Sequence, residues 1–173
     1  MKTVLHYFSK GMDVVERILR LLIGIAMVIM VVIIFYQVIL RYVLNASNIW
    51  SEELARYLMC YVVLLGAAVA IRKYSHLQVD FALNMLPARA RCIAVAICTL
   101  AGIVFLVFFC QYGIDLCLNT ANSTSSGTGI PMSYAYACLP IGGILMILAS
   151  VEVILKELTK FIDLGHEKKE VQA

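Results

Sequence analysis

The residues best suited to chemistry form one dense charged cluster between positions 49 and 57. Glu52 and Glu53 precede Arg56 by four and three residues, so on a helix both carboxylates lie within reach of the guanidinium. Ser51 is a suitable N-cap, and acids in the first turn complement the helix dipole. Two interpretations stay open: a helix cap with an interfacial anchor, or a recognition surface that faces another subunit.

Other reactive residue types lack the spacing that chemistry needs. The six cysteines include no C-x-x-C pair, and most lie within or beside apolar runs, where free cysteine behaves as a small hydrophobe. Only Cys117 is a candidate for a disulfide. The three histidines, His6, His76 and His166, lie outside the apolar runs, so no haem ligand pair is predicted. With no nucleophile–base pair either, we expect neither an enzyme nor a cofactor or metal site.

The charged cluster lies in a chain that is unusually rich in apolar residues, and this composition limits the elements that can position it. Of 173 residues, 62% are hydrophobic and 14% charged, whereas soluble domains average roughly 45–50% and about 25%. A soluble domain of this composition would lack the polar surface to cover itself, and disorder is excluded as well. The net charge of +3 is too small to indicate a nucleic-acid-binding surface.

The apolar residues are gathered into four runs. A helix needs about 20 residues to cross a ~30 Å hydrocarbon core. We therefore predict an all-α membrane protein with four transmembrane helices in a single integral domain, residues 1–173. In the second span, Arg56 is expected to extend its guanidinium towards the interface. The predicted spans are residues 21–40, 54–71, 92–114 and 130–151.

Segments outside the spans are also predicted to be largely helical. The leader, residues 3–20, has apolar residues at helical spacing, which indicates an N-terminal amphipathic helix. It either lies in the membrane interface or simply extends the first span. Residues 72–91 favour a short interfacial helix between the second and third spans, and residues 119–129 favour a flexible loop. The tail, residues 152–173, continues as a helix with Glu152 four residues before Lys156.

Basic residues set the expected orientation. Twelve of the fourteen Lys and Arg residues lie in the leader, in the loop between the second and third spans, or in the tail. Under the positive-inside rule, both termini are therefore cytoplasmic. The charged cluster then lies at the outer face, where Arg41 could join its charges. Tyr42 and Trp50 suit an aromatic belt there.

The middles of the predicted spans contain no ionisable residue, which distinguishes between classes of membrane protein. A self-sufficient small exporter would need a mid-membrane acid, and the membrane anchor of a respiratory enzyme would need intramembrane histidines. Small residues at four-residue spacing, such as Ala94, Cys98 and Gly102, indicate close helix packing, either within this chain or against a larger partner. The pattern favours a scaffold over either alternative.

Four motifs follow one another in the first two spans and the loop after them: Gln37-Val38-x-x-Arg41-Tyr42, Trp50-Ser51-Glu52-Glu53-Leu54-Ala55-Arg56, Gly66-Ala67-Ala68 and Arg72-x-x-x-His76-x-x-x-Asp80. This ordered set resembles the small membrane subunit (Q-type, DctQ-like) of TRAP (tripartite ATP-independent periplasmic) transporters. The resemblance covers about residues 10–155. The sequence from Ile49 to Leu54, together with Tyr61, is most similar to the sialic-acid branch.

The resemblance implies a non-catalytic scaffold subunit in a bacterial inner membrane. Such transporters import organic acids, typically carboxylates, with a sodium gradient. The implied partners are a large multi-span subunit with an elevator-like motion, a periplasmic substrate-binding protein and membrane lipids; sodium would bind the large subunit, not this chain. The residues carried over as partner-interface or anchoring positions are Arg41, Tyr42, Trp50, Glu52, Glu53, Arg56, Arg72, His76 and Asp80.

Overall fold

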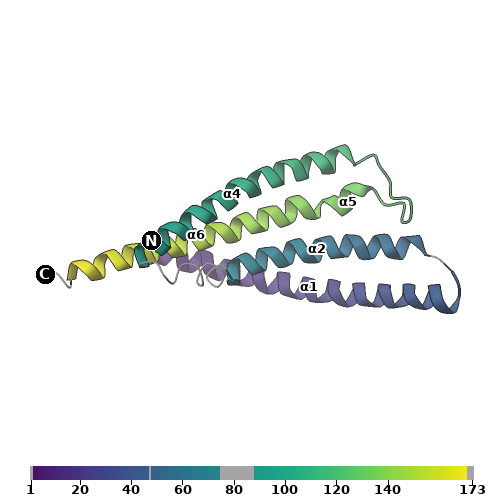
Figure 1. Ribbon diagram of the computed structural model, residues 1–173, viewed down its shortest axis with the longest axis horizontal. Coiled ribbons are helices and arrows are strands. Elements are labelled where there is room, and N and C mark those ends of the chain that lie inside the picture. The colour runs from purple at the N-terminus through teal and green to yellow at the C-terminus, as the bar shows by residue number, and fades with distance from the viewer. Residues whose placement is uncertain (1, 47, 75–87, 171–173) are drawn as a thin grey trace.

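A computed structural model describes residues 2–46, 48–74 and 88–170, and its long elements are all helices. This confirms the all-α prediction. The predicted interfacial helix between the second and third spans falls largely on residues 75–87, outside the described residues, as do His76 and Asp80. The elements are α1 (Lys2–Val43), α2 (Ile49–Tyr74), α4 (Ala88–Asn119), α5 (Met132–Tyr136) and α6 (Cys138–Glu170) (Figure 1).

Four helical stretches are long and apolar enough to cross a membrane, as predicted. A helix satisfies its backbone polar groups internally, which is the requirement for a segment in lipid. The leader is helical too, and it continues into the first span without interruption as one helix, α1. The side of the membrane on which the termini lie stays a prediction. The four stretches are Ser9–Val43, Ile49–Lys73, Ala94–Asn119 and Met132–Lys156.

The helices lie side by side as a layer, in the order α4, α6, α2, α1 (Figure 1). The central helix α6 packs against α4 on one side and α2 on the other, and α1 packs against α2. The N- and C-termini lie at one end of this layer, called here the terminal end. The connections from α1 to α2 and from α4 to α5 lie at the opposite, loop end (Figure 1).

Two adjacent glycines let α6 approach both of its neighbours. A Cβ added to Gly142 would lie 2.8 Å from Leu64 Cβ on α2, and one added to Gly143 would overlap the Cys110 sulfur on α4. Close approach of this kind is the usual role of small residues between membrane helices, where lipid gives no hydrophobic drive. Part of the small-residue pattern is therefore used for packing within this chain.

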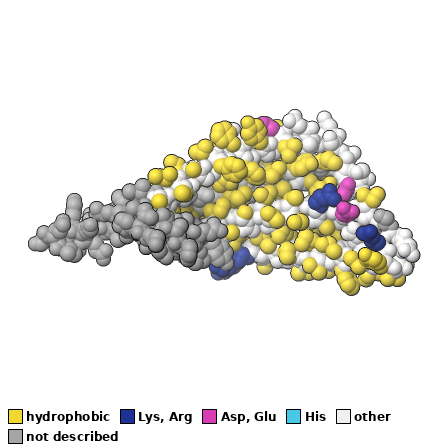
Figure 2. All heavy atoms as spheres, viewed as in Figure 1, with side chains coloured by type: hydrophobic (Ala, Val, Ile, Leu, Met, Phe, Trp, Pro, Cys, Tyr) yellow, Lys and Arg dark blue, Asp and Glu magenta, His cyan; other side chains and the backbone are white. Residues whose placement is uncertain are grey.

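Most large apolar side chains point outwards from the layer. The buried core is small and is centred on Ala68, Leu106 and Met146, one each from α2, α4 and α6. Hydrophobic side chains cover much of the face seen in Figure 2, and the few charged ones lie near the loop end or along the edges of this face. A soluble monomer rarely exposes so much contiguous apolar surface, so lipid or a partner must cover these faces.

Candidate functional site

A buried ion cluster joins three helices at the terminal end. Arg72, near the end of α2, donates from Nε to Glu152 Oε2 at 2.7 Å and from Nη2 to Glu152 Oε1 at 3.2 Å. Glu152 lies on α6 and is fully buried, and the Arg72 side chain is only 7% exposed. Two parallel bonds between a guanidinium and a carboxylate are the strong, directional form of an ion pair.

The N-terminal part of α1 completes the coordination of Arg72. Its Nη1 donates to the Glu16 carboxylate, while Nη2 donates to the Asp13 carboxylate and to the Ser9 carbonyl. The Ser9 hydroxyl also donates to Glu152 Oε1 at 2.9 Å. Positions 9, 13 and 16 share one helix face, so a single stripe of the leader contacts both α2 and α6.

The cluster balances three acids with three bases. Lys156 Nζ lies 2.7 Å from Glu152 Oε1, which confirms the expected i,i+4 pair in the tail, and Arg20 pairs with Glu16. Together with Arg72 and Asp13, the formal charges sum to zero. Charge balance matters here because an uncompensated buried charge would be strongly destabilising.

The structure identifies partners for Arg72 that the sequence analysis did not predict. The family resemblance implied only that Arg72 is an anchoring or interface residue. Ser9, Asp13 and Glu16 on one face of the amphipathic leader were the available signal, together with an acid directly after the fourth predicted span. In the structure, Arg72 binds acceptors within its own chain and thereby connects α1, α2 and α6.

At the loop end, the structure corrects the expected role of Ser51. Helix α2 begins at Ile49, so Ser51 lies inside the first turn and is not the N-cap. Its hydroxyl donates to the Asn48 carbonyl at 3.0 Å, and its side chain is fully buried. The helix therefore begins three residues before Glu52, the residue at which a helix capped by Ser51 would begin.

Glu53 also contacts different groups from those predicted. It was expected to reach Arg56, but its carboxylate turns to the connection between α4 and α5. It accepts hydrogen bonds from the Ser125 hydroxyl, from Ser126 Oγ at 3.4 Å and from the Gly127 amide at 3.2 Å. A Cβ on Gly127 would lie 2.9 Å from Glu53 Oε2, so the absence of a side chain permits this approach.

The connection that Glu53 binds is closed by its own backbone hydrogen bonds. The Ser125 amide donates to the Ile130 carbonyl at 3.0 Å, and the Met132 amide donates to the Ser123 carbonyl at 2.8 Å. The prediction of a flexible loop at 119–129 therefore missed an ordered turn. Its Ser, Thr and Gly residues supply local donors and acceptors and, at Gly129, a positive φ of 67°.

The remaining charged residues form an exposed patch at the loop end. Arg56 Nη2 donates to Glu52 Oε1 at 3.0 Å, with side chains 68% and 62% exposed. Among the described residues, Arg41 pairs with neither acid; its guanidinium carbon lies 5.9 Å from the centroid of the Tyr42 ring. Arg41, Tyr42 and Glu52 line an open groove of about 630 Å³ between the ends of α1 and α2. We call Arg41, Tyr42, Glu52 and Arg56 the outer patch.

Trp50 is placed by an aromatic contact and not by the charges. Its ring centroid lies 6.3 Å from that of Tyr36 on α1, with the planes tilted by 39°. Such tilted pairs are a favourable aromatic geometry. The free thiol of Cys117, the candidate for a disulfide, contacts the Ser133 carbonyl at 3.8 Å. The seven predicted positions that the structure describes therefore do not form one site.

The fold defines a helical multi-pass membrane protein, and comparison with known proteins gives its family. Residues 30–160 match the family described as tripartite ATP-independent periplasmic transporters, DctQ component. The chain belongs to this family of TRAP small permease subunits, which are transporter components and not enzymes.

Two similar proteins from one species are named for different organic acids. The chain is 32% identical over 128 residues to the sialic acid TRAP transporter small permease protein SiaQ of Vibrio cholerae, covering 74% of each chain. It is 26% identical to the C4-dicarboxylate small permease protein DctQ of the same species, covering 95% of this chain and 82% of the relative.

A third relative shows the segment inside a longer protein. The sialic acid TRAP transporter permease protein SiaT of Haemophilus influenzae is 32% identical over 120 residues, which cover 69% of this chain but only 20% of the relative. Such fused relatives imply that the small subunit associates with the large permease subunit.

Removing Arg72 tests the importance of the ion cluster. R72M removes the cation that Glu152 and Glu16 share and leaves each acid with one more exposed partner, Lys156 or Arg20, so the free energy of unfolding should fall by up to about 3–5 kcal/mol. The change is measured by reversible unfolding in detergent. The matched control is R56M, which breaks an exposed pair and should cost less than about 1 kcal/mol. Equal losses in the two variants would contradict this role.

Replacing Glu53 tests the contact between α2 and the ordered turn. E53Q keeps the size of the side chain but presents amide donors to a region of hydroxyl and amide donors, at a cost of about 1–3 kcal/mol. Faster hydrogen exchange at the amides of Ser125 and Met132 is expected. E52Q is the control, because Glu52 has no contact with the turn. Unchanged exchange in E53Q would show that the turn is ordered without Glu53.

Proposed function

We propose that this chain is the non-catalytic scaffold subunit of a sodium-driven transporter that imports a carboxylate, with sialic acid as the favoured substrate. Membership of the DctQ family is the observation that carries the proposal. Sialic acid is favoured because two relatives at 32% identity are named for it. The partners are a large membrane subunit, which binds sodium and substrate, and a periplasmic binding protein.

The shape of the molecule supports a static role. The single layer of helices exposes many large apolar side chains, including those on the face in Figure 2, which suits a surface that widens another membrane protein. The ion cluster fixes α1, α2 and α6 to one another through buried charged hydrogen bonds. Separating these helices would expose unpaired charges to lipid, so the layer resists deformation. An elevator-type carrier needs such a fixed frame to move against.

The distribution of charge supports the orientation that places both termini in the cytoplasm. The basic leader and tail lie at the terminal end, so this end faces the cytoplasm under the positive-inside rule. The outer patch then faces the periplasm. Arg41, Glu52 and Arg56 are exposed there, and Arg41 has no described ion partner, so the patch suits contact with the binding protein. Glu53 and Trp50 instead support the local fold.

Reconstitution tests the proposed function directly. The chain is co-purified with the large membrane subunit of its transporter, placed in liposomes and supplied with the binding protein. We expect sialic acid uptake only with an inward sodium gradient, and none when this chain is omitted. The substrate control uses the same liposomes and binding protein, with a C4-dicarboxylate in place of sialic acid. Sodium-driven uptake by this chain alone, or undiminished uptake without it, would overturn the scaffold role.

Charge reversal tests the outer patch in the same assay. R41E combined with R56E should raise the binding-protein concentration needed for half-maximal uptake by roughly three- to tenfold, because exposed interface charges act mainly on association. K10E, which reverses an exposed basic residue at the terminal end, is the control and should leave that concentration unchanged. An unchanged value for the double variant would show that the patch does not contact the binding protein.

A further inference from the structure

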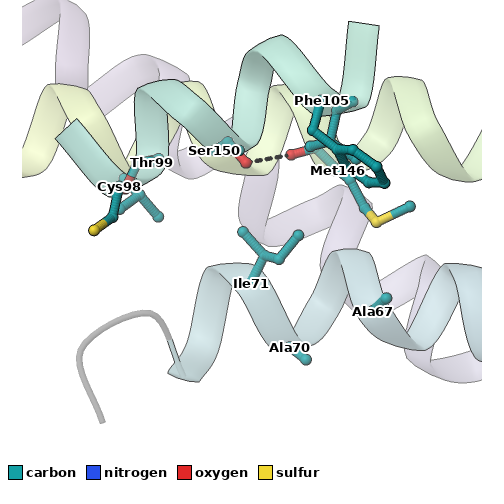
Figure 3. A pocket seen from close by; sticks show the side chains of 11 residues that line it. Ala67, Ala70, Ile71, Cys98, Thr99, Phe105, Met146 and Ser150 are labelled. Carbon is teal, nitrogen blue, oxygen red and sulfur yellow. Dashed lines mark hydrogen bonds between the residues drawn. The ribbon is translucent and has the colours of Figure 1, made fainter. Parts of the chain in front are cut away.

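A groove of about 620 Å³ lies between α2 and α4, with α6 at its base. Its sides come from separate helices: Ala67, Ala70 and Ile71 lie on α2, whereas Cys98, Thr99 and Phe105 lie on α4 (Figure 3). The groove exists because α2 and α4 both pack against α6 and scarcely contact each other. Its full lining is Ala67, Ala70, Ile71, Cys98, Thr99, Gly102, Phe105, Leu106, Met146, Ser150 and Val153.

Gly102, in the wall that α4 forms, is not used for packing within the chain, although Ala67 on the opposite wall also packs against the core. A Cβ added to Gly102 would have no atom within 4 Å, in contrast to Gly142 and Gly143, which contact neighbouring helices. Cys98 and Gly102 are four residues apart on α4, and Ala67 and Ala70 are three apart on α2, so each pair presents one face. At the level of these small residues, and above all at Gly102, the backbone of another helix can approach closely.

The polar groups in the groove already have partners. Thr99 Oγ1 donates to the Val95 carbonyl at 2.8 Å, and Ser150 Oγ donates to the Met146 carbonyl at 2.8 Å (Figure 3). Neither hydroxyl therefore needs a hydrogen bond from an ion, a lipid headgroup or a carboxylate substrate. An apolar occupant with a narrow, helical outline fits this surface.

We propose that the groove between α2 and α4 receives a transmembrane helix of the large permease subunit, a proposal that rests on the proposed function. The fused relative supports this occupant over a second copy or a lipid chain. In that protein the matched segment is 20% of the length, so the remaining four-fifths is tethered beside it. A tethered segment has a high effective concentration and occupies a complementary groove before a free competitor does.

Two glycine substitutions test the groove. G102L adds a side chain to the open groove, and G24L adds the same side chain to open space on α1, since both positions have no atom within 4 Å of an added Cβ. In co-purification with the large permease, G102L should lose about tenfold or more of the bound permease, because overpacking a helix contact typically costs 1–3 kcal/mol. G24L should retain it. Both isolated chains should unfold like the wild type.

Two native cysteines can report whether the groove is covered, without any substitution in the chain. Cys98 lies in the groove, whereas Cys60 is an exposed thiol on α2 that does not line it. Labelling with a membrane-permeant maleimide, read for each cysteine by peptide mass spectrometry, should fall for Cys98 on complex formation by about tenfold more than for Cys60. Equal change at both thiols would overturn the proposal.

Other outcomes identify a different occupant and equally overturn the proposal. If G102L keeps the permease but loses a co-purified phospholipid, the groove holds a lipid chain. If it keeps the permease but abolishes a dimer of the isolated chain, the groove holds a second copy. Failure of the wild-type chain to co-purify with the permease at all would instead contradict the proposed function, so the two proposals fail separately.

Discussion

The buried pairing of Arg72 with Glu152 is the interaction on which the arrangement of helices most depends. Apolar surfaces alone cannot hold these helices in one order, since lipid tails are as apolar as the side chains themselves. A guanidinium near the membrane has few acceptable surroundings, and Glu152, Glu16 and Asp13 supply them from two other helices. The need to surround one cation therefore determines which helices meet at the terminal end.

The same reasoning separates the two ends of the molecule. At the terminal end, Arg72 and Glu152 are buried and the charged groups around them are mutually paired, which makes that end a structural junction. At the loop end, one acid of the predicted cluster, Glu53, is committed to an ordered turn, while its neighbour Glu52 stays exposed with Arg56. Adjacent acids therefore have opposite roles, one for the fold and one available to a partner.

Sequence reasoning predicted the helical class and the four spans because both follow from hydropathy and length. It missed the contacts of Glu53 because an i,i+3 rule describes a helix surface and contains no information about a loop 72 residues away. It could not supply the partners of Arg72 for the same reason: the stripe at positions 9, 13 and 16 is visible, but its neighbours depend on helix order. Small-residue spacing likewise predicted close packing without showing that Gly142 is enclosed and Gly102 is open.

The position of α6 has a consequence for biogenesis. This helix follows the other described helices in the chain and is synthesised after them, yet it lies at the centre of the layer and contributes Glu152. Until it inserts, α2 and α4 have no shared neighbour among the described helices, and Arg72 has only Asp13 and Glu16 of α1 to balance its charge. The helices α1 and α2 can pair first, whereas α4 gains its place in the layer only through α6. A chain that stops before Glu152 would therefore lose both the buried acid beside Arg72 and the helix that joins the two sides of the layer.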